Sequence, residues 1–306
     1  MGARRTAVLL FALVLGASAC DRTSAPPPNV ERDDAVTIAS FNFPESVLLA
    51  QIYGQALDAA GVRVKHEPAL GTRELVMPAL VQGLVELVPE YAGSALVFLS
   101  GPASASADHD ANHRALASEL SGFGVTALDA SPAEDQNGFA VTRETAARFG
   151  LHTLSDLAAV ADQLTFGGPP ECLRRPSCLP GLESTYGIEF GNEILTLDSG
   201  GGRTVAALAQ GTIDVGLLFT SDGALELNDF VLLRDDKGLQ PAENVTPVVR
   251  LGALERFPGL AATVNAVSAL LTTEELRSMN AEVGGGGDPR AIAGAWLVRN
   301  GLSAER

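Results

Sequence analysis

Apolar, β-branched runs alternate along the chain with segments whose apolar residues recur at helical spacing. The early runs predict strands over 36–41, 62–67 and 85–88, and the intervening segments predict helices over 44–60 and 73–83. Pro44 lies in the first turn of the first helix, a position that proline favours. This β-α-β-α-β order predicts an α/β fold with a parallel sheet and helices on its faces.

The alternation restarts near residue 140. Predicted strands cover 138–142, 164–167, 194–198 and 213–219, and predicted helices cover 154–161, 181–186 and 204–210. A strand over 245–250 and helices from about 259 onward follow, with a loose glycine connection at 284–287. A chain of 306 residues is expected to fold as two lobes rather than around one core.

Polar and aromatic residues follow the ends of the first three predicted strands. In parallel sheets, ligands bind beyond the carboxyl ends of the strands. We therefore expect one rim to carry the residues after these strands, namely Asn42, Phe43, Gly71, Thr72, Glu90 and Tyr91. Tyr91 is one of only three tyrosines, and a half-buried packing role is an equal alternative for it.

The N-terminus has the pattern of an export signal. Arg4 and Arg5 precede an apolar run of about 14 residues, which is too short to span a bilayer. We expect residues 1–19 to be a signal peptide and 20–34 a flexible, proline-rich linker. Residues 17–20 resemble a bacterial lipobox, so Cys20 is expected to carry a lipid, with ordinary cleavage as the alternative.

The chain contains three cysteines. If Cys20 is lipidated, Cys172 and Cys178 remain, and in an oxidising compartment we expect them to form a disulfide. Zinc binding is disfavoured because no second Cys/His pair follows at ligand spacing.

The chain is strongly acidic. Its formal charge is −16, and removing Arg4 and Arg5 with the signal makes it −18. Such a surface repels nucleic acid, so we expect no nucleic-acid partner.

Two further segments are candidates for chemistry. Residues 198–204 join a strand to a helix through three consecutive glycines followed by Arg203, and this turn is either an anion site or a simple tight turn. His109 and His113 stand at i, i+4, which keeps a metal-binding lipoprotein as an alternative. An α/β hydrolytic enzyme is a third alternative, disfavoured because no nucleophile elbow or metalloprotease motif appears. We expect no enzyme activity and no cofactor.

Several segments together resemble the solute-binding proteins of glycine betaine/choline ABC transporters. They are 38–45, 88–96, 197–201, 218–222 and 235–244, and they follow one another in the family's order over nearly the whole mature chain. The resemblance implies a type II periplasmic-binding fold, with two lobes joined by two crossovers. It places lobe 1 at 35–139 plus 237–306 and lobe 2 at 140–236.

The resemblance also implies a function. A lipid-anchored or periplasmic protein would close on a small solute and deliver it to a permease driven by a separate ATPase. Family members commonly hold a trimethylammonium group in a cage of tyrosines by cation–π attraction.

The sequence departs from this cage at several positions. Tyr91 matches a cage tyrosine, but Asn137, Phe219 and the neighbourhood of Arg203 occupy other aromatic positions, and Ser46 replaces a glutamine. The expected ligand-binding residues are Asn42, Phe43, Ser46, Thr72, Tyr91, Asn137, Arg203, Thr204 and Phe219. With an anion site at 200–204, the chain is expected to prefer a zwitterionic or carboxylate solute over choline.

Overall fold

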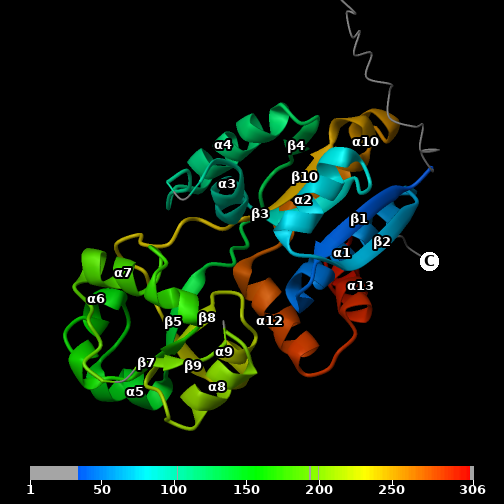
Figure 1. Cartoon of the computed structure of the whole chain (residues 1–306). Helices are drawn as coiled ribbons and strands as arrows, with labels where there is room; N and C mark the ends of the chain where they lie inside the picture. The colour runs from blue at the N-terminus through cyan, green and yellow to red at the C-terminus, as the bar shows by residue number, and fades with distance from the viewer. Residues whose placement is uncertain (1–33, 102, 193, 199, 304–306) are drawn as a thin grey trace, which may run out of the picture. The chain divides into compact units, whose positions relative to one another are not determined.

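The computed structural model describes residues 34–101, 103–192, 194–198 and 200–303. These residues form two five-stranded sheets, both of mixed strand direction and both flanked by helices (Figure 1). The expected signal peptide, Cys20 and nearly all of the expected linker lie outside the described residues. Among the residues that are described, no helix is long and apolar enough to cross a membrane.

The first sheet has the strand order β2-β1-β3-β10-β4. Its strands are β1 (Val36–Phe41), β2 (Val64–Gly71), β3 (Leu87–Tyr91), β4 (Val125–Ala127) and β10 (Val245–Arg250). The predicted parallel arrangement is correct for β1, β2 and β3, whereas β10 runs antiparallel to β3 and β4. The sheet is therefore mixed, because a strand from the far end of the chain completes it.

Helices cover both faces of this sheet. They are α1 (Pro44–Ala59), α2 (Arg73–Gln82), α3 (Ala92–Ser100), α4 (His109–Ser121), α10 (Leu251–Arg256), α11 (Leu260–Leu270), α12 (Thr273–Gly284) and α13 (Pro289–Arg299). The core between them includes the fully buried Ile38, Leu87 and Trp296. Helix α1 packs against α11 and α13, so the two ends of the described chain share one core.

The second sheet has the order β7-β6-β8-β5-β9. Its strands are β5 (Asn137–Thr142), β6 (Phe166–Gly168), β7 (Ile194–Thr196), β8 (Val215–Phe219) and β9 (Phe230–Leu233). Strand β6 is parallel to β7 and β8, and β5 is antiparallel to β8 and β9. The expected lobe boundary at 139/140 falls inside β5, whose pairing with β8 already begins at Asn137.

Short helices surround the second sheet. They are α5 (Arg143–Phe149), α6 (Leu154–Leu157), η1 (Ala161–Gln163), η2 (Pro170–Leu173), α7 (Leu179–Gly181), η3 (Leu182–Tyr186), α8 (Gly202–Ala209) and α9 (Ala224–Leu227). The predicted helix over 154–161 is wrong beyond Leu157. A disulfide joins the buried Cys172 and Cys178 across a Cα–Cα distance of 5.1 Å and closes an exposed loop beside α7.

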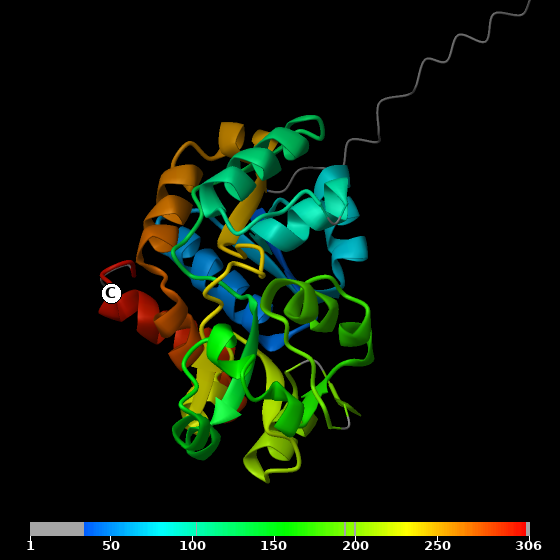
Figure 2. The same cartoon turned by 90° about the vertical axis from the view of Figure 1, so that its left-hand side faces the viewer.

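The chain passes between the sheets twice, through 128–136 and back through 234–244. An antiparallel bridge pairs Glu134 with Asn244, and the Asp135 N–H donates to the Glu243 carbonyl at 3.2 Å. The two connections therefore lie side by side. In Figure 2 the green and yellow-green elements of the second sheet lie in the lower half of the view, below the cyan helices.

Candidate functional site

Tyr91 is the last residue of β3, and α3 begins directly after it. The sequence predicted that β3 ends at residue 88, with Glu90 and Tyr91 beyond it, and this boundary is wrong. Pro89 does not end the strand, because it lies opposite Pro247 of β10 in a non-hydrogen-bonded pair, where no N–H donor is needed. Tyr91 is only 4% exposed, so its ring packs at the strand end instead of projecting freely.

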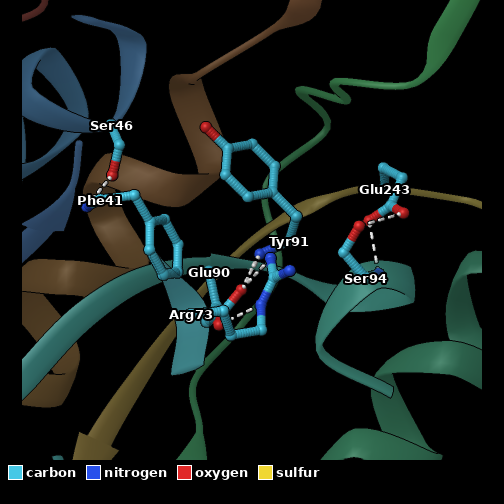
Figure 3. Close-up of polar contacts among 7 residues, drawn as sticks. All are labelled: Phe41, Ser46, Arg73, Glu90, Tyr91, Ser94 and Glu243. Carbon is cyan, nitrogen blue, oxygen red and sulfur yellow. Dashed lines mark hydrogen bonds and ion pairs between the residues drawn. The ribbon is translucent and has the colours of Figure 1, made fainter. Parts of the chain in front are cut away.

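Buried charges surround the backbone of Tyr91. The Glu90 carboxylate accepts hydrogen bonds from Arg73 Nε at 2.8 Å and Nη2 at 2.9 Å, and also from the Tyr91 N–H at 2.9 Å. Figure 3 shows the Tyr91 ring pointing away from this ion pair. The Arg73 guanidinium also lies 5.1 Å from the centre of the Phe41 ring. Arg73 is thus committed to Glu90 and to an aromatic face.

The phenol of Tyr91 is directed at a second buried carboxylate. Its hydroxyl donates to Glu45 Oε1 at 2.6 Å, and Glu45 lies in the first turn of α1. Asn280 of α12 donates to the other oxygen, Oε2, at 2.5 Å. Sequence reasoning missed Glu45 as a site residue, although its place just after the first strand end was a usable signal.

An exposed aromatic ring accompanies Tyr91. The ring centre of Phe43 lies 6.0 Å from that of Tyr91 and 5.9 Å from that of Phe41, and Phe43 is 37% exposed. Asn42 and Thr72 are also exposed, and the Asn42 N–H bonds to the carbonyl of Gly71. The structure therefore brings the expected residues of the first three strand ends to one rim.

Ser46 has a role different from the expected one. It is fully buried, and its hydroxyl oxygen accepts the Phe41 N–H at 2.9 Å (Figure 3). This contact ties α1 to the end of β1. In this structure Ser46 exposes no surface to a solute.

Asn137 and Phe219 gather at the second sheet. They are directly opposed on antiparallel β5 and β8, so their side chains share one face. A Cβ added at Gly200 would lie 3.0 Å from the Phe219 ring and 3.6 Å from Asp222 Oδ2, which places Gly200 against both. Three predicted features of the second sheet are therefore neighbours.

The turn before α8 is already occupied by its own aspartate. Asp198 Oδ2 accepts the Arg203 N–H at 3.0 Å, and Oδ1 accepts the Thr204 N–H at 2.9 Å. The Thr204 hydroxyl lies 2.7 Å from Oδ1 and 2.8 Å from the Asp198 carbonyl. Burial raises the pKa of Asp198, but these hydrogen bonds outweigh it and hold the pKa below its usual value.

The expectation that these backbone donors await a solute is therefore wrong at residues 203 and 204. A helix N-terminus attracts an anion only while its N–H groups lack a partner. Thr204 is fully buried and serves the turn, whereas Arg203 is exposed. The exposed Arg203 side chain remains as one group that the turn can offer a carboxylate.

Three carboxyl groups, those of Glu45, Asp135 and Asp222, lie near one another beside Tyr91 and the turn after β8. Burial raises the pKa of Glu45, and nearby Asp222 adds to the effect. Burial, followed by the charge of Glu45, also raises the pKa of Asp135 well above its usual value, and burial raises that of Asp222. Ser221 donates to Asp135 Oδ1 at 2.7 Å and helps to hold this group in place. A cationic solute group placed here would stabilise the ionised form of these carboxyls, whereas an anionic group would raise their pKa values further.

The two histidines of the metal alternative have other partners. His113 Nε2 lies 2.8 Å from the Leu128 carbonyl, and His109 lies 3.3 Å from Asp110 at the exposed start of α4. Within the described part of the chain, no three His, Cys, Asp or Glu side chains are grouped as metal ligands would be.

Comparison with known proteins settles the family. The OpuAC family, described as the substrate binding domain of ABC-type glycine betaine transport systems, matches residues 34–299. The chain belongs to this family. Its members bind small solutes for ABC importers, act with permease components outside the cytoplasm, and are not enzymes.

Individual relatives agree with the assignment. The glycine betaine-binding protein YehZ of Escherichia coli is 27% identical over 87% of this chain and 90% of its own length. The carnitine transport binding protein OpuCC of Listeria monocytogenes is 26% identical over 96% of both chains. A glycine-betaine-binding protein of Pseudomonas aeruginosa is 28% identical over 82% of both.

Solved structures show the same fold. A glycine betaine/carnitine/choline ABC transporter structure matches 87% of this chain and 99% of its own, with a TM-score of 0.81 and 24% identity. The structure of solute-free YehZ matches 88% of this chain and 99% of its own, with a TM-score of 0.76 and 26% identity. The predicted two-lobed α/β binding-protein fold is thereby confirmed.

Proposed function

We propose that the chain captures a small quaternary-ammonium zwitterion, with glycine betaine as the first candidate, between two lobes and delivers it to an ABC permease. The observation that carries this proposal is the family match over residues 34–299, together with the aromatic rim formed by Tyr91 and Phe43. Relatives named for glycine betaine and carnitine support the same solute class.

The charges around the rim support a cationic group as the part of the solute that lies deepest. A trimethylammonium group against Tyr91 would gain cation–π attraction, up to about 2 kcal/mol when desolvated. Glu45, Asp135 and Asp222 lie near this point and favour positive charge. The carboxylate of the solute would extend toward the exposed Arg203 at the second sheet. Asn42, Thr72, Asn137 and Phe219 complete the proposed contacts.

The proposal includes the remaining sequence-based assignments. Lobe 1 would comprise 35–139 plus 237–306 and lobe 2 would comprise 140–236, with the first boundary moved back to Asn137 so that β5 stays whole. The side-by-side connections would form the hinge. Residues 1–19 would be removed on export, and Cys20 would anchor the 20–34 linker to the outer face of the membrane. Mass spectrometry of the native protein tests this, since a mature N-terminus beyond Cys20 contradicts it.

Thermal unfolding with a panel of solutes tests the solute class. Glycine betaine, carnitine, choline and ergothioneine would each be added to the mature protein. A solute present at about 100 times its Kd should add roughly 2.7 kcal/mol to the free energy of unfolding. If no member of the panel raises the midpoint, the quaternary-ammonium proposal is wrong, and simple carboxylates become the next class to test.

A further inference from the structure

Helix α12 packs with the helices of the first sheet and is hydrogen-bonded to the turn that follows β8 of the second sheet. Arg277 donates from Nε at 3.0 Å and from Nη2 at 2.7 Å to the Thr220 carbonyl. Asn280 donates to the Ser221 carbonyl at 2.9 Å. A Cβ on Gly223 would lie only 2.3 Å from the backbone nitrogen of Ala281, so the turn and the helix touch backbone to backbone.

These α12 residues stand at i, i+3 and i+4 and therefore lie on one face of the helix. The turn they hold begins directly after Phe219, the candidate aromatic residue of the second sheet. Consecutive carbonyls of the turn, at 220 and 221, are each fixed by a different side chain. The position of Phe219 is consequently tied to α12.

The same Asn280 amide also reaches the first rim. Its two N–H bonds go to the Ser221 carbonyl and to Glu45 Oε2, and the other oxygen of Glu45 accepts the Tyr91 hydroxyl. Both partners of this amide are acceptors, so the nitrogen and not the oxygen must face them. A continuous hydrogen-bonded path thus runs from the 220–223 turn through Asn280 and Glu45 to Tyr91.

We propose that Asn280 and Arg277 are positioning residues that hold the 220–223 turn, and with it Phe219, in a fixed relation to Tyr91. Neither residue needs to touch the solute. Their consequence for affinity rests on the function proposed above, whereas their hold on the turn does not. The family resemblance pointed to the aromatic positions and gave no role to α12.

Replacing Asn280 with aspartate gives a sharp test because the two side chains have nearly the same shape. Asn280→Asp removes both donors and sets a carboxylate against Glu45 Oε2 and the Ser221 carbonyl. Glu45 is faced by the Tyr91 hydroxyl, by Ser221 and Asp222 of the turn, and by the charge of Asp135 on the first connection. The paired carboxylates at 45 and 280 should share a proton as the pH falls, which would restore a hydrogen bond.

Amide hydrogen exchange of the solute-free protein measures the hold directly. Compared with wild type at the same pH, Asn280→Ala and Asn280→Asp should speed exchange in the 219–225 segment about tenfold at pH 8, the effect of losing one or two buried hydrogen bonds. At pH 5 the aspartate variant should return toward wild type, and the alanine variant should not. Ser278→Ala, an exposed change on the same helix, is the matched control.

The proposal is overturned if Asn280→Ala and Ser278→Ala exchange alike, or if the two Asn280 variants respond alike to pH. Arg277→Ala removes the hydrogen bonds to the Thr220 carbonyl and leaves the contacts of Glu45 in place. If the Asn280 variants do not fold, amide exchange of Arg277→Ala therefore provides the test. Calorimetry should then show that each variant binds glycine betaine with a Kd about tenfold weaker than that of wild type. Absence of binding by wild type would count against the proposed solute, while the exchange result would still decide the role of α12.

Discussion

Two strand-to-helix junctions face the proposed site, and at each one a carboxylate caps the start of the helix. The two carboxylates differ in how far they lie from the helix in the sequence. At the start of α3, Glu243 accepts the Ser94 N–H and hydroxyl, both at 2.8 Å, from 149 residues away (Figure 3). At the start of α8, Asp198 serves Arg203 and Thr204 from five and six residues away. Both carboxylates satisfy donors that a helix start leaves unpaired.

This difference determines which other parts of the molecule each junction is bonded to. The α8 cap is complete within its own turn, so it stabilises one helix. The α3 cap belongs to the connection between the sheets, and the neighbouring Asp135 N–H bonds to the Glu243 carbonyl on the same connection. The α3 junction, which carries Tyr91, is therefore linked to the region where the proposed hinge lies, and the α8 junction is not.

The largest predicted effect is the pH dependence that Glu243 gives to stability. Burial raises the pKa of this carboxyl from 4.5 to about 7. The folded chain then holds a proton that the unfolded chain has released, so stability falls as the pH rises from about 4.5 to about 7. The shift corresponds to at most ~3 kcal/mol. Chemical unfolding of wild type and Glu243→Gln between pH 4.5 and 8 measures it.

Glu45, Asp135 and Asp222 have raised pKa values as well and change stability in the same direction. The difference between wild type and Glu243→Gln isolates the one group. Parallel pH profiles for the two proteins would show that Glu243 contributes no such linkage.

The next effect concerns the aromatic face at the α3 junction. Tyr91→Leu keeps an apolar side chain but removes the ring, and a cation–π contact of about 2 kcal/mol corresponds to a Kd for glycine betaine about 30-fold weaker. Calorimetry checks this. Tyr53→Leu is the control, since Tyr53 is equally buried and bonds to Ser268 on α11. Equal losses of affinity in the two variants would indicate general damage and not a lost contact.

A smaller effect is expected at the α8 junction. Asp198→Ala should lower the free energy of unfolding by about 1 kcal/mol, the usual cost of losing a helix cap. Because the cap is local, the pH profile set by Glu243 should stay unchanged. Denaturant unfolding at pH 5 and pH 8 measures both quantities, and a changed profile would mean that the two junctions are coupled.

The sequence predicted the local parts of this picture well. Strand β10 and the start of α1 were placed correctly because their apolar patterns and Pro44 are local signals. The antiparallel place of β10 and the Glu45–Asn280 contact depend on residues far apart in the sequence, which no spacing rule reveals. The Asp198 cap was missed for another reason: the glycines and Arg203 suggested an anion site, and the aspartate at the start of the same motif fills it.

The smallest predicted effect is at Arg203, whose side chain is exposed at the α8 junction. An exposed ion pair contributes about 0.2–1 kcal/mol, so Arg203→Ala should weaken the binding of glycine betaine by about 1.4- to fivefold. Choline has no carboxylate, and its Kd should stay the same. Calorimetry with both solutes at low and moderate salt decides the point, because an ionic contact weakens as salt is added. An equal loss of affinity for choline would show that the substitution disturbs the turn itself. No loss of affinity for either solute would show that Arg203 is an ordinary surface residue.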